Sequence, residues 1–249
     1  AGPHEALSLI QSRRTVARVP AGDDTMHIPR RPLRFPWRER NRLELLPQGT
    51  SYFPAMLNAI DAAHSQVALE FYWFETGAVG NRFIRSLARA AARGVRVMML
   101  LDDYGGSDLD AIDRRRLTDA GVHLVRFNPL RVRLGWGNLL RDHRKLLLVD
   151  DHVAFVGGTG IADVFDGAFG WRDNMLRIEG ECVADWWRLF RQVWLRGSAL
   201  ECPLPASRPA GSERGRVIGG GAGPWRAILA AAIGDIRSAR ERVWLVTPY

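Results

Sequence analysis

The sequence predicts an α/β domain with a mixed, mostly parallel sheet flanked by helices on both faces, followed by the start of a second, similar lobe. Three observations support this. Apolar segments of strand length alternate with helical segments of about 10 to 15 residues, the pattern of βαβ units. The 249 residues, 47% hydrophobic and 25% charged, suffice for one large domain and part of another. Near the C-terminus, the layout of residues 45–57 recurs.

The elements follow in order along the chain. Residues 1–42 are rich in arginine and proline and are expected to be a basic, poorly ordered leader. Residues 43–196 should form the first lobe. Its expected strands are 43–46, 66–74, 95–101 and 122–127, and its expected helices are 50–64, 79–93 and 108–120. Gly94 and Gly121 stand where the last two of these helices should end.

Residues 142–160 carry the most informative pattern. Two short apolar runs flank Asp150, Asp151 and His152, which predicts a strand, a tight turn and a second strand. His143 and Lys145 are two positions apart, so on a strand they point the same way, about 7 Å apart. The alternative is a core strand whose polar residues happen to fall in this order.

Lys145 is also the only lysine among the 35 basic residues of the chain. A lysine offers a compact charge with rotatable donors, whereas arginine is a planar fork, so the two are not interchangeable beside a moving phosphoryl oxygen. The single lysine favours a functional interpretation of this strand.

The spacing of His143, Lys145 and Asp150 is HxKxxxxD, and Gly157 and Gly158 follow six residues later. This resembles the signature of the phospholipase D superfamily. The flanking segments LEFYWFETG, LLDDYGG and WRDNMLRIEG are similar to those of bacterial cardiolipin synthases. The asparagine that usually follows the glycines is replaced by Gly160.

The resemblance implies a phosphatidyltransferase that needs no metal or other cofactor and works through a phosphohistidine. His143 would be the nucleophile or its acid/base partner, and Lys145 would bind the phosphate. Asp150 would orient the motif, while Gly157 and Gly158 would let the backbone approach the site. Asp173 matches the acidic residue that hydrogen-bonds the catalytic histidine in this superfamily; a strand-end salt bridge is its alternative role.

Candidates for substrate binding lie in two segments. Tyr72 and Trp73 belong to an aromatic stretch that ends a strand, where α/β folds place ligands, although core packing is the alternative. Trp136 and Arg141 belong to residues 128–141, a basic and apolar loop that could receive a lipid or could be an ordinary loop. Asp102 and Asp103 suggest a turn and helix cap rather than a metal site.

Charge and cysteine content indicate partners and compartment. The net charge of +8 indicates anionic partners, an anionic phospholipid such as phosphatidylglycerol or, less favoured, a nucleic acid. Cys182 and Cys202 have no metal-like spacing and predict reduced thiols in the cytosol. No apolar run approaches about 18 residues. We therefore expect peripheral contact with the cytoplasmic side of the cell membrane.

The C-terminal part predicts a repeat. Residues 181–195 carry an apolar stripe typical of a packed helix. The Pro, Ser and Gly content of residues 197–215 predicts a linker. Residues 216–249 then repeat the strand, helix and strand of the first lobe, with a strand at 243–245. A second half-site with the HxKxxxxD (HKD) motif would come from a C-terminal lobe or from a homodimer. The alternatives are a dimeric nuclease or phosphodiesterase of the same superfamily and a catalytically incomplete lipid- or nucleic-acid-binding member.

Overall fold

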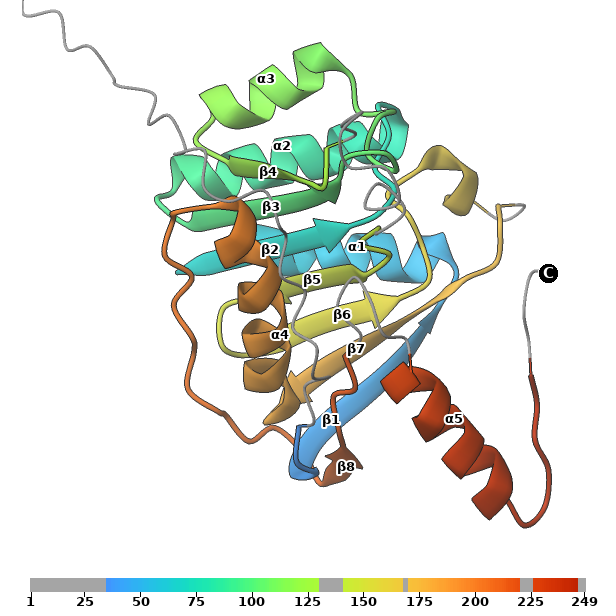
Figure 1. Cartoon of the computed structure of the whole chain (residues 1–249). Coiled ribbons are helices and arrows are strands. Elements are labelled where there is room, and N and C mark those ends of the chain that lie inside the picture. Colours follow the sequence, from blue (N-terminus) through green and yellow to red (C-terminus); the bar gives the residue numbers. More distant parts are fainter. Residues whose placement is uncertain (1–34, 130–140, 168–169, 220–225, 246–249) are drawn as a thin grey trace, which may run out of the picture.

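The structure is a computed structural model that describes residues 35–129, 141–167, 170–219 and 226–245. One eight-stranded sheet forms its centre, with the order β4-β3-β2-β5-β6-β7-β1-β8 (Figure 1). The strands are β1 (Arg38–Pro47), β2 (Gln66–Phe71), β3 (Arg96–Asp102), β4 (His123–Phe127), β5 (Lys145–Val149), β6 (Val153–Gly157), β7 (Asn174–Gly180) and β8 (Glu213–Gly215). The helices are α1 (Gly49–Asp61), α2 (Ala78–Ala92), α3 (Ala111–Asp119), α4 (Cys182–Gly197) and α5 (Arg226–Ser238), with a short 3-10 helix, η2 (Asp163–Phe165).

The expectation of a mostly parallel sheet is wrong. Only β2–β3 and β3–β4 are parallel pairs, and the other five pairs are antiparallel. The helical crossovers α2 and α3 return the chain to the same end of the sheet, which makes β2, β3 and β4 parallel. After β4 that alternation stops: β5 and β6 are joined by a tight turn at Asp150, and a turn of this length can only reverse the chain.

Helices cover both faces of the sheet, as expected. Helices α1, α2 and α3 lie on one face and α4 lies on the other (Figure 1). Strand β2 is buried over its whole length because it lies in the middle of the sheet between the two layers. On α4, Trp187, Phe190 and Trp194 are almost completely buried, so the predicted packed helix face is confirmed.

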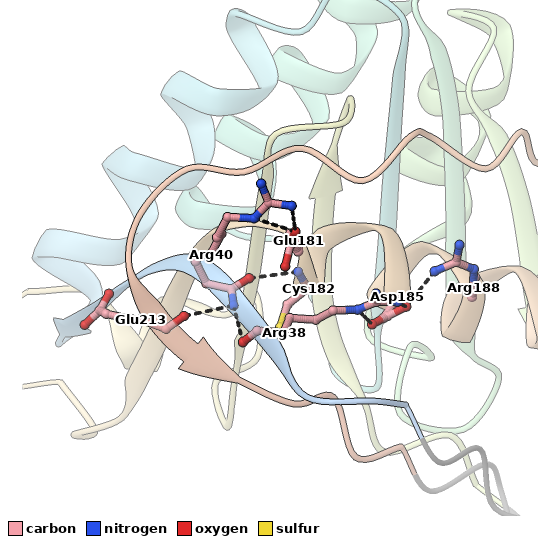
Figure 2. Close-up of polar contacts among 8 residues, drawn as sticks. Arg38, Arg40, Glu181, Cys182, Asp185, Arg188 and Glu213 are labelled. Carbon is pink, nitrogen blue, oxygen red and sulfur yellow. Dashed lines mark hydrogen bonds and ion pairs between the residues drawn. The ribbon is translucent and has the colours of Figure 1, made fainter.

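The first strand begins earlier than the sequence indicated. β1 starts at Arg38, so residues 38–42 belong to the sheet and not to the leader. The guanidinium of Arg38 makes two bonds of 2.8 and 2.9 Å to the buried carboxylate of Asp185 on α4 (Figure 2). Arg188 adds a third at 2.6 Å. The sequence pattern missed this start because residues 38–42 are all polar and, of the whole of β1, only Asn41 and Leu46 are buried.

The expected linker is also partly fixed to the first lobe. Asn41 of β1 is fully buried, and its amide donates to the carbonyl of Glu213 in β8 and accepts from the backbone N–H of Cys182. Cys202, in the middle of the segment, is fully buried in the core under α4. Both cysteines are free, and burial raises the pKa of each thiol to about 11, so both are protonated at neutral pH.

The C-terminal repeat is described only in part. Helix α5 lies where the repeat predicts a helix and extends away from the sheet, with Ile228 and Ile236 about half exposed (Figure 1). The strand predicted at Val243–Leu245 does not form, although these residues lie within the described range. Their side chains are exposed, and a strand needs a neighbour with which to pair its backbone groups.

Candidate active site

The structure places His143 and Lys145 beside the same aromatic ring. His143 lies two residues before β5 and is exposed, whereas Lys145 begins β5 and is only 6% exposed. The ring centroids of His143 and Tyr72 are 4.6 Å apart, and Nζ of Lys145 is 5.2 Å from the centroid of Tyr72. An imidazole and an ammonium group therefore lie against the same ring.

Strand pairing explains this arrangement. Lys145 lies opposite Phe71 in the antiparallel register of β5 and β2. Paired residues share a face, and Phe71 belongs to the core under α1 and α2. Arg144 points to the other face, where its guanidinium is 3.4 Å from the carbonyl of Leu189 on α4. Alternation along one strand therefore separates a lysine on one side from an arginine on the other.

Burial governs the charges of the two residues. It lowers the pKa of Lys145 to about 8, against the opposing effect of Asp142, Asp173 and Asp102. Partial burial of the imidazole also lowers the pKa of His143, and the neighbouring charge of Lys145 lowers it further. At neutral pH, Lys145 is therefore mostly cationic and His143 is neutral, the states that phosphate binding and nucleophilic or basic catalysis need.

Asp150 lies apart from His143 and Lys145, and its expected role in orienting the motif stays a prediction. It begins the turn after β5, roughly 17 Å along the strand from Lys145. Its carboxylate accepts hydrogen bonds of 2.7 to 2.9 Å from the backbone N–H groups of His64, Ser65 and Gln66 and from the Ser65 hydroxyl. Burial alone would raise the pKa of Asp150, but these bonds together lower it. Asp150 can orient the motif only through the fold.

The two glycines of the motif let the start of β7 approach β6. A Cβ atom at Gly157 would overlap the carbonyl of Asn174, and one at Gly158 would lie 2.7 Å from both carboxylate oxygens of Asp173. The expected hydrogen bond from Asp173 to His143 is absent among the described contacts. The Asp173 carboxylate instead accepts from the backbone N–H of Asn174 at 2.7 Å, because that strand-end donor is adjacent to it.

Gly160 packs against an indole. A Cβ atom at Gly160 would lie 3.1 to 3.2 Å from three atoms of Trp73. Trp73 also makes edge contacts with Phe165 and Trp171, at centroid distances of 5.6 and 6.3 Å. Of the aromatic candidates, Tyr72 thus contacts His143, whereas Trp73 fills the space beside the residue that replaces the usual asparagine.

The remaining substrate-binding candidates are only partly described. Trp136 lies outside the described residues. Arg141 contacts the end of β3, with Nη1 3.3 Å from a carboxylate oxygen of Asp102 and 3.1 Å from the carbonyl of Asn128. Asp102 also accepts the backbone N–H groups of Tyr104 and Gly105, which confirms its predicted role in a turn.

Sequence reasoning missed a buried polar group next to the motif. Glu70, Asp142 and Arg144 lie together on the α4 side of β5, with Arg144 between the two carboxyl groups. A signal was available, since Glu70 interrupts the apolar run from Val67 to Phe71 and a buried acid needs a partner.

A cavity in the described part of the chain does not involve His143. This cavity, of about 470 Å³, lies at the other end of β5, lined by His64, Gln66, Asp150, His152 and Arg208 among others. His143 does not line this cavity, and its side chain is exposed. Within the described residues, no cluster of three or more His, Cys, Asp or Glu side chains could hold a metal ion, and no helix could span a bilayer.

The fold is that of the phospholipase D superfamily. A phosphatidylserine synthase from Haemophilus influenzae Rd KW20 superposes with a TM-score of 0.53 at 14% identity, covering 65% of this chain and 39% of the other. Nuc, a phospholipase D family member from Salmonella typhimurium, superposes with a TM-score of 0.51 at 16% identity, covering 64% of this chain and 97% of Nuc.

Sequence comparison identifies the family to which the chain belongs. The profile "Cardiolipin synthase, PLD-like domain" matches residues 56–194, and the chain belongs to that family. Cardiolipin synthase A of Pseudomonas fluorescens is 32% identical over 228 residues, which are 87% of this chain and 47% of that protein. Cardiolipin synthase B of Salmonella typhi is 36% identical over 154 residues, 60% of this chain and 37% of that protein. The chain thus spans about half the length of the relatives it matches, or less.

Proposed function

We propose that this chain supplies half of the active site of a phosphatidyltransferase of the cardiolipin synthase and phospholipase D type. The observation that carries the proposal is the exposed imidazole of His143 beside the ammonium group of Lys145, both against Tyr72. The similarity to cardiolipin synthases supports a phospholipid phosphodiester as substrate, such as phosphatidylglycerol.

The proposed reaction has two steps. A ring nitrogen of the nucleophilic histidine attacks phosphorus, the bond from phosphorus to the leaving alcohol oxygen breaks, and an acid gives that oxygen a proton. The hydroxyl of an acceptor alcohol then attacks phosphorus, the phosphorus–nitrogen bond breaks, and the former acid takes the hydroxyl proton. Lys145 would bind a non-bridging oxygen throughout and offset its charge.

One imidazole cannot attack phosphorus and protonate the leaving group from opposite sides at once, so a second histidine is required. His143 is therefore either the nucleophile or the acid/base partner. The second half-site would come from a further lobe or from a second copy of the chain. The exposure of His143 and the greater length of the relatives support such a pairing. The exposed apolar residues of α5 support a further lobe.

The substrate would require contact with a membrane surface. A net charge of +8 favours anionic lipid, and we propose peripheral contact with the cytoplasmic side of the cell membrane. The same charge would also favour nucleic acid, which keeps a phosphodiesterase acting on DNA as the second candidate.

Two substrates decide between these functions. Full-length protein is incubated with phosphatidylglycerol vesicles and separately with single-stranded DNA, while glycerol release and strand cleavage are measured. The proposal predicts glycerol release without strand cleavage. Strand cleavage alone would replace it with the nuclease, and binding of either substrate without turnover would indicate a catalytically incomplete binding protein.

A further inference from the structure

A buried polar cluster lies directly behind His143, on the opposite face of the strand. Arg144 brings Nη2 to 2.6 Å from Oε1 of Glu70 and Nε to 3.2 Å from Oδ1 of Asp142. The Glu70 and Asp142 side chains are 1% and 4% exposed, and the Arg144 side chain is 14% exposed. Arg144 reaches the carbonyl of Leu189 on α4, and Glu70 lies opposite Leu146, which belongs to the core under α4, so these groups lie on the α4 face of the sheet.

The charges of this cluster do not balance if both acids are ionised. Two carboxylates and one guanidinium would leave one net negative charge in the interior, where an uncompensated charge is strongly disfavoured. Both carboxylate oxygens of Glu70 and Oδ2 of Asp142 are buried without a hydrogen-bond partner among the described residues. Oε1 of Glu70 makes the ion pair with Arg144, which leaves Oε2 of Glu70 and Oδ2 of Asp142. A single proton shared between these two oxygens would satisfy both and neutralise the cluster.

The pKa directions agree on which acid holds that proton. Burial raises the pKa of Glu70 well above its ordinary value, and the Asp142 charge and hydrogen bond add to the rise against the opposing effect of Arg144. Burial would also raise the pKa of Asp142, but Arg144 and the hydrogen bond from Glu70 lower it overall. Two acids whose pKa values are driven apart in this way commonly share one proton.

Other charged groups face the cluster from neighbouring elements. From α4, Arg196 approaches Arg144 closely enough for their charges to repel. At the end of β3, Asp102 accepts the backbone N–H of Asp142 at 2.9 Å and also contacts Arg141 at 3.3 Å. Lys145 lies on the other face of β5.

Asp142 and Arg144, which flank His143 in the sequence, also fix the backbone on both sides of it. The N–H of Asp142 is tied to Asp102, and the carbonyl of Arg144 accepts the N–H of Tyr72 at 3.2 Å. The second of these bonds also fixes Tyr72, whose ring contacts His143. A shift of the cluster would therefore move both the imidazole and the ring beside it.

We propose that Glu70, Asp142 and Arg144 form a neutral positioning cluster in which Glu70 is a carboxylic acid that donates its proton to Asp142, and that the cluster fixes His143 for catalysis. The positioning role rests on the proposed function. The protonation of Glu70 does not.

The test compares variants of Glu70 in the full-length protein. Glu70→Gln retains a neutral donor of the same shape, so its kcat on phosphatidylglycerol vesicles should stay within about threefold of wild type. Glu70→Ala removes the contacts with both Arg144 and Asp142, so the kcat of this variant should fall by about tenfold or more with little change in KM. A Gln variant as impaired as the Ala variant would overturn the protonated acid, and an Ala variant with wild-type kcat would overturn the positioning role.

Thermal unfolding gives a second readout that needs no activity. Asp185→Asn is the matched control, because Asp185 is equally buried but pairs with Arg38 and Arg188 as a carboxylate. At pH 8, Glu70→Gln should unfold at or above the wild-type midpoint, whereas Asp185→Asn should unfold well below it. An equal loss in both variants would overturn the assignment of the proton.

The pH dependence has a defined sign. An acid with a raised pKa in the folded state destabilises the fold as pH rises from its ordinary pKa to the raised one. The Glu70→Gln variant should lack this loss, and an unchanged pH dependence would count against the cluster. If wild-type protein turns over no phospholipid, the proposed function fails, and these unfolding measurements still decide whether Glu70 is protonated.

Discussion

Lys145 donates a hydrogen bond from Nζ to the backbone carbonyl of His143 at a distance of 2.9 Å. The ammonium group is thereby held against the residue that carries the imidazole, and two of its three N–H donors remain for other partners. A phosphoryl oxygen bound by those donors would lie close to His143.

The protonation state of Lys145 should limit the reaction at alkaline pH. Its pKa of about 8 means that the cation is lost as pH rises through that value. We expect kcat/KM on phosphatidylglycerol to fall above about pH 8. Measurement of initial rates from pH 6 to 10 tests this, and a rate that stays constant to pH 10 would remove the lysine from phosphate binding.

Lys145→Arg provides the control for that experiment. Arginine stays charged over the whole range, so the alkaline fall should disappear. The maximal rate should nevertheless drop by about 10² or more, because the planar guanidinium cannot reproduce the ammonium contacts at this buried position.

Asp150 should matter for stability and not for chemistry. Asp150→Ala would leave the N–H groups of His64, Ser65 and Gln66 without their acceptor, and we expect the free energy of unfolding to fall by about 3 kcal/mol. The free energy of unfolding should fall less in Asp150→Asn, since asparagine keeps one acceptor oxygen and tolerates the positive φ of 49° at this position. Urea unfolding measures both.

The contribution of Asp150 to stability should depend on pH, because its pKa is lowered in the folded state. In the wild-type protein this contribution to the free energy of unfolding should be present above the ordinary aspartate pKa. It should be lost as pH falls through the pKa that Asp150 has in the folded state. Asp150→Ala should not show this loss. A variant of normal stability but reduced kcat would contradict a purely structural role.

Gly160 should resist replacement by the asparagine that the superfamily usually carries. The added side chain would press on Trp73, and we expect Gly160→Asn to lower the free energy of unfolding by about 1 to 3 kcal/mol. Combining it with Trp73→Ala should cost less than the sum of the two single changes, because the smaller side chain makes room. Additive losses in a double-mutant cycle would show that the two positions do not interact.

Much of the fold could be predicted because it is encoded locally. Helices α1, α2 and α4 follow from apolar periodicity, and β5 and β6 follow from two apolar runs around Asp150. Strand direction could not be predicted, because the antiparallel pairing of β5 with β2 depends on contacts between distant segments. The early start of β1 depends in the same way on Arg38 reaching Asp185 on α4.

The site was predictable to a smaller extent. The spacing of His143 and Lys145 placed both on one side of a strand, and the structure adds the Tyr72 ring that they share. Asp150 belongs to the same sequence motif, but the length of β5 separates it from His143 and Lys145 in space. The Glu70 cluster escaped prediction because its partners Asp142 and Arg144 are distant in the sequence and lie just before another strand, β5.

The central claim is that His143 carries out the chemistry on a phospholipid phosphodiester. Its most direct test is the initial rate of glycerol release from phosphatidylglycerol vesicles by full-length His143→Ala, with His152→Ala at the other end of β5 as the control. We predict a fall of about 10³-fold or more for His143→Ala and no more than about twofold for His152→Ala. A folded His143→Ala variant that releases glycerol at the wild-type rate would contradict the account.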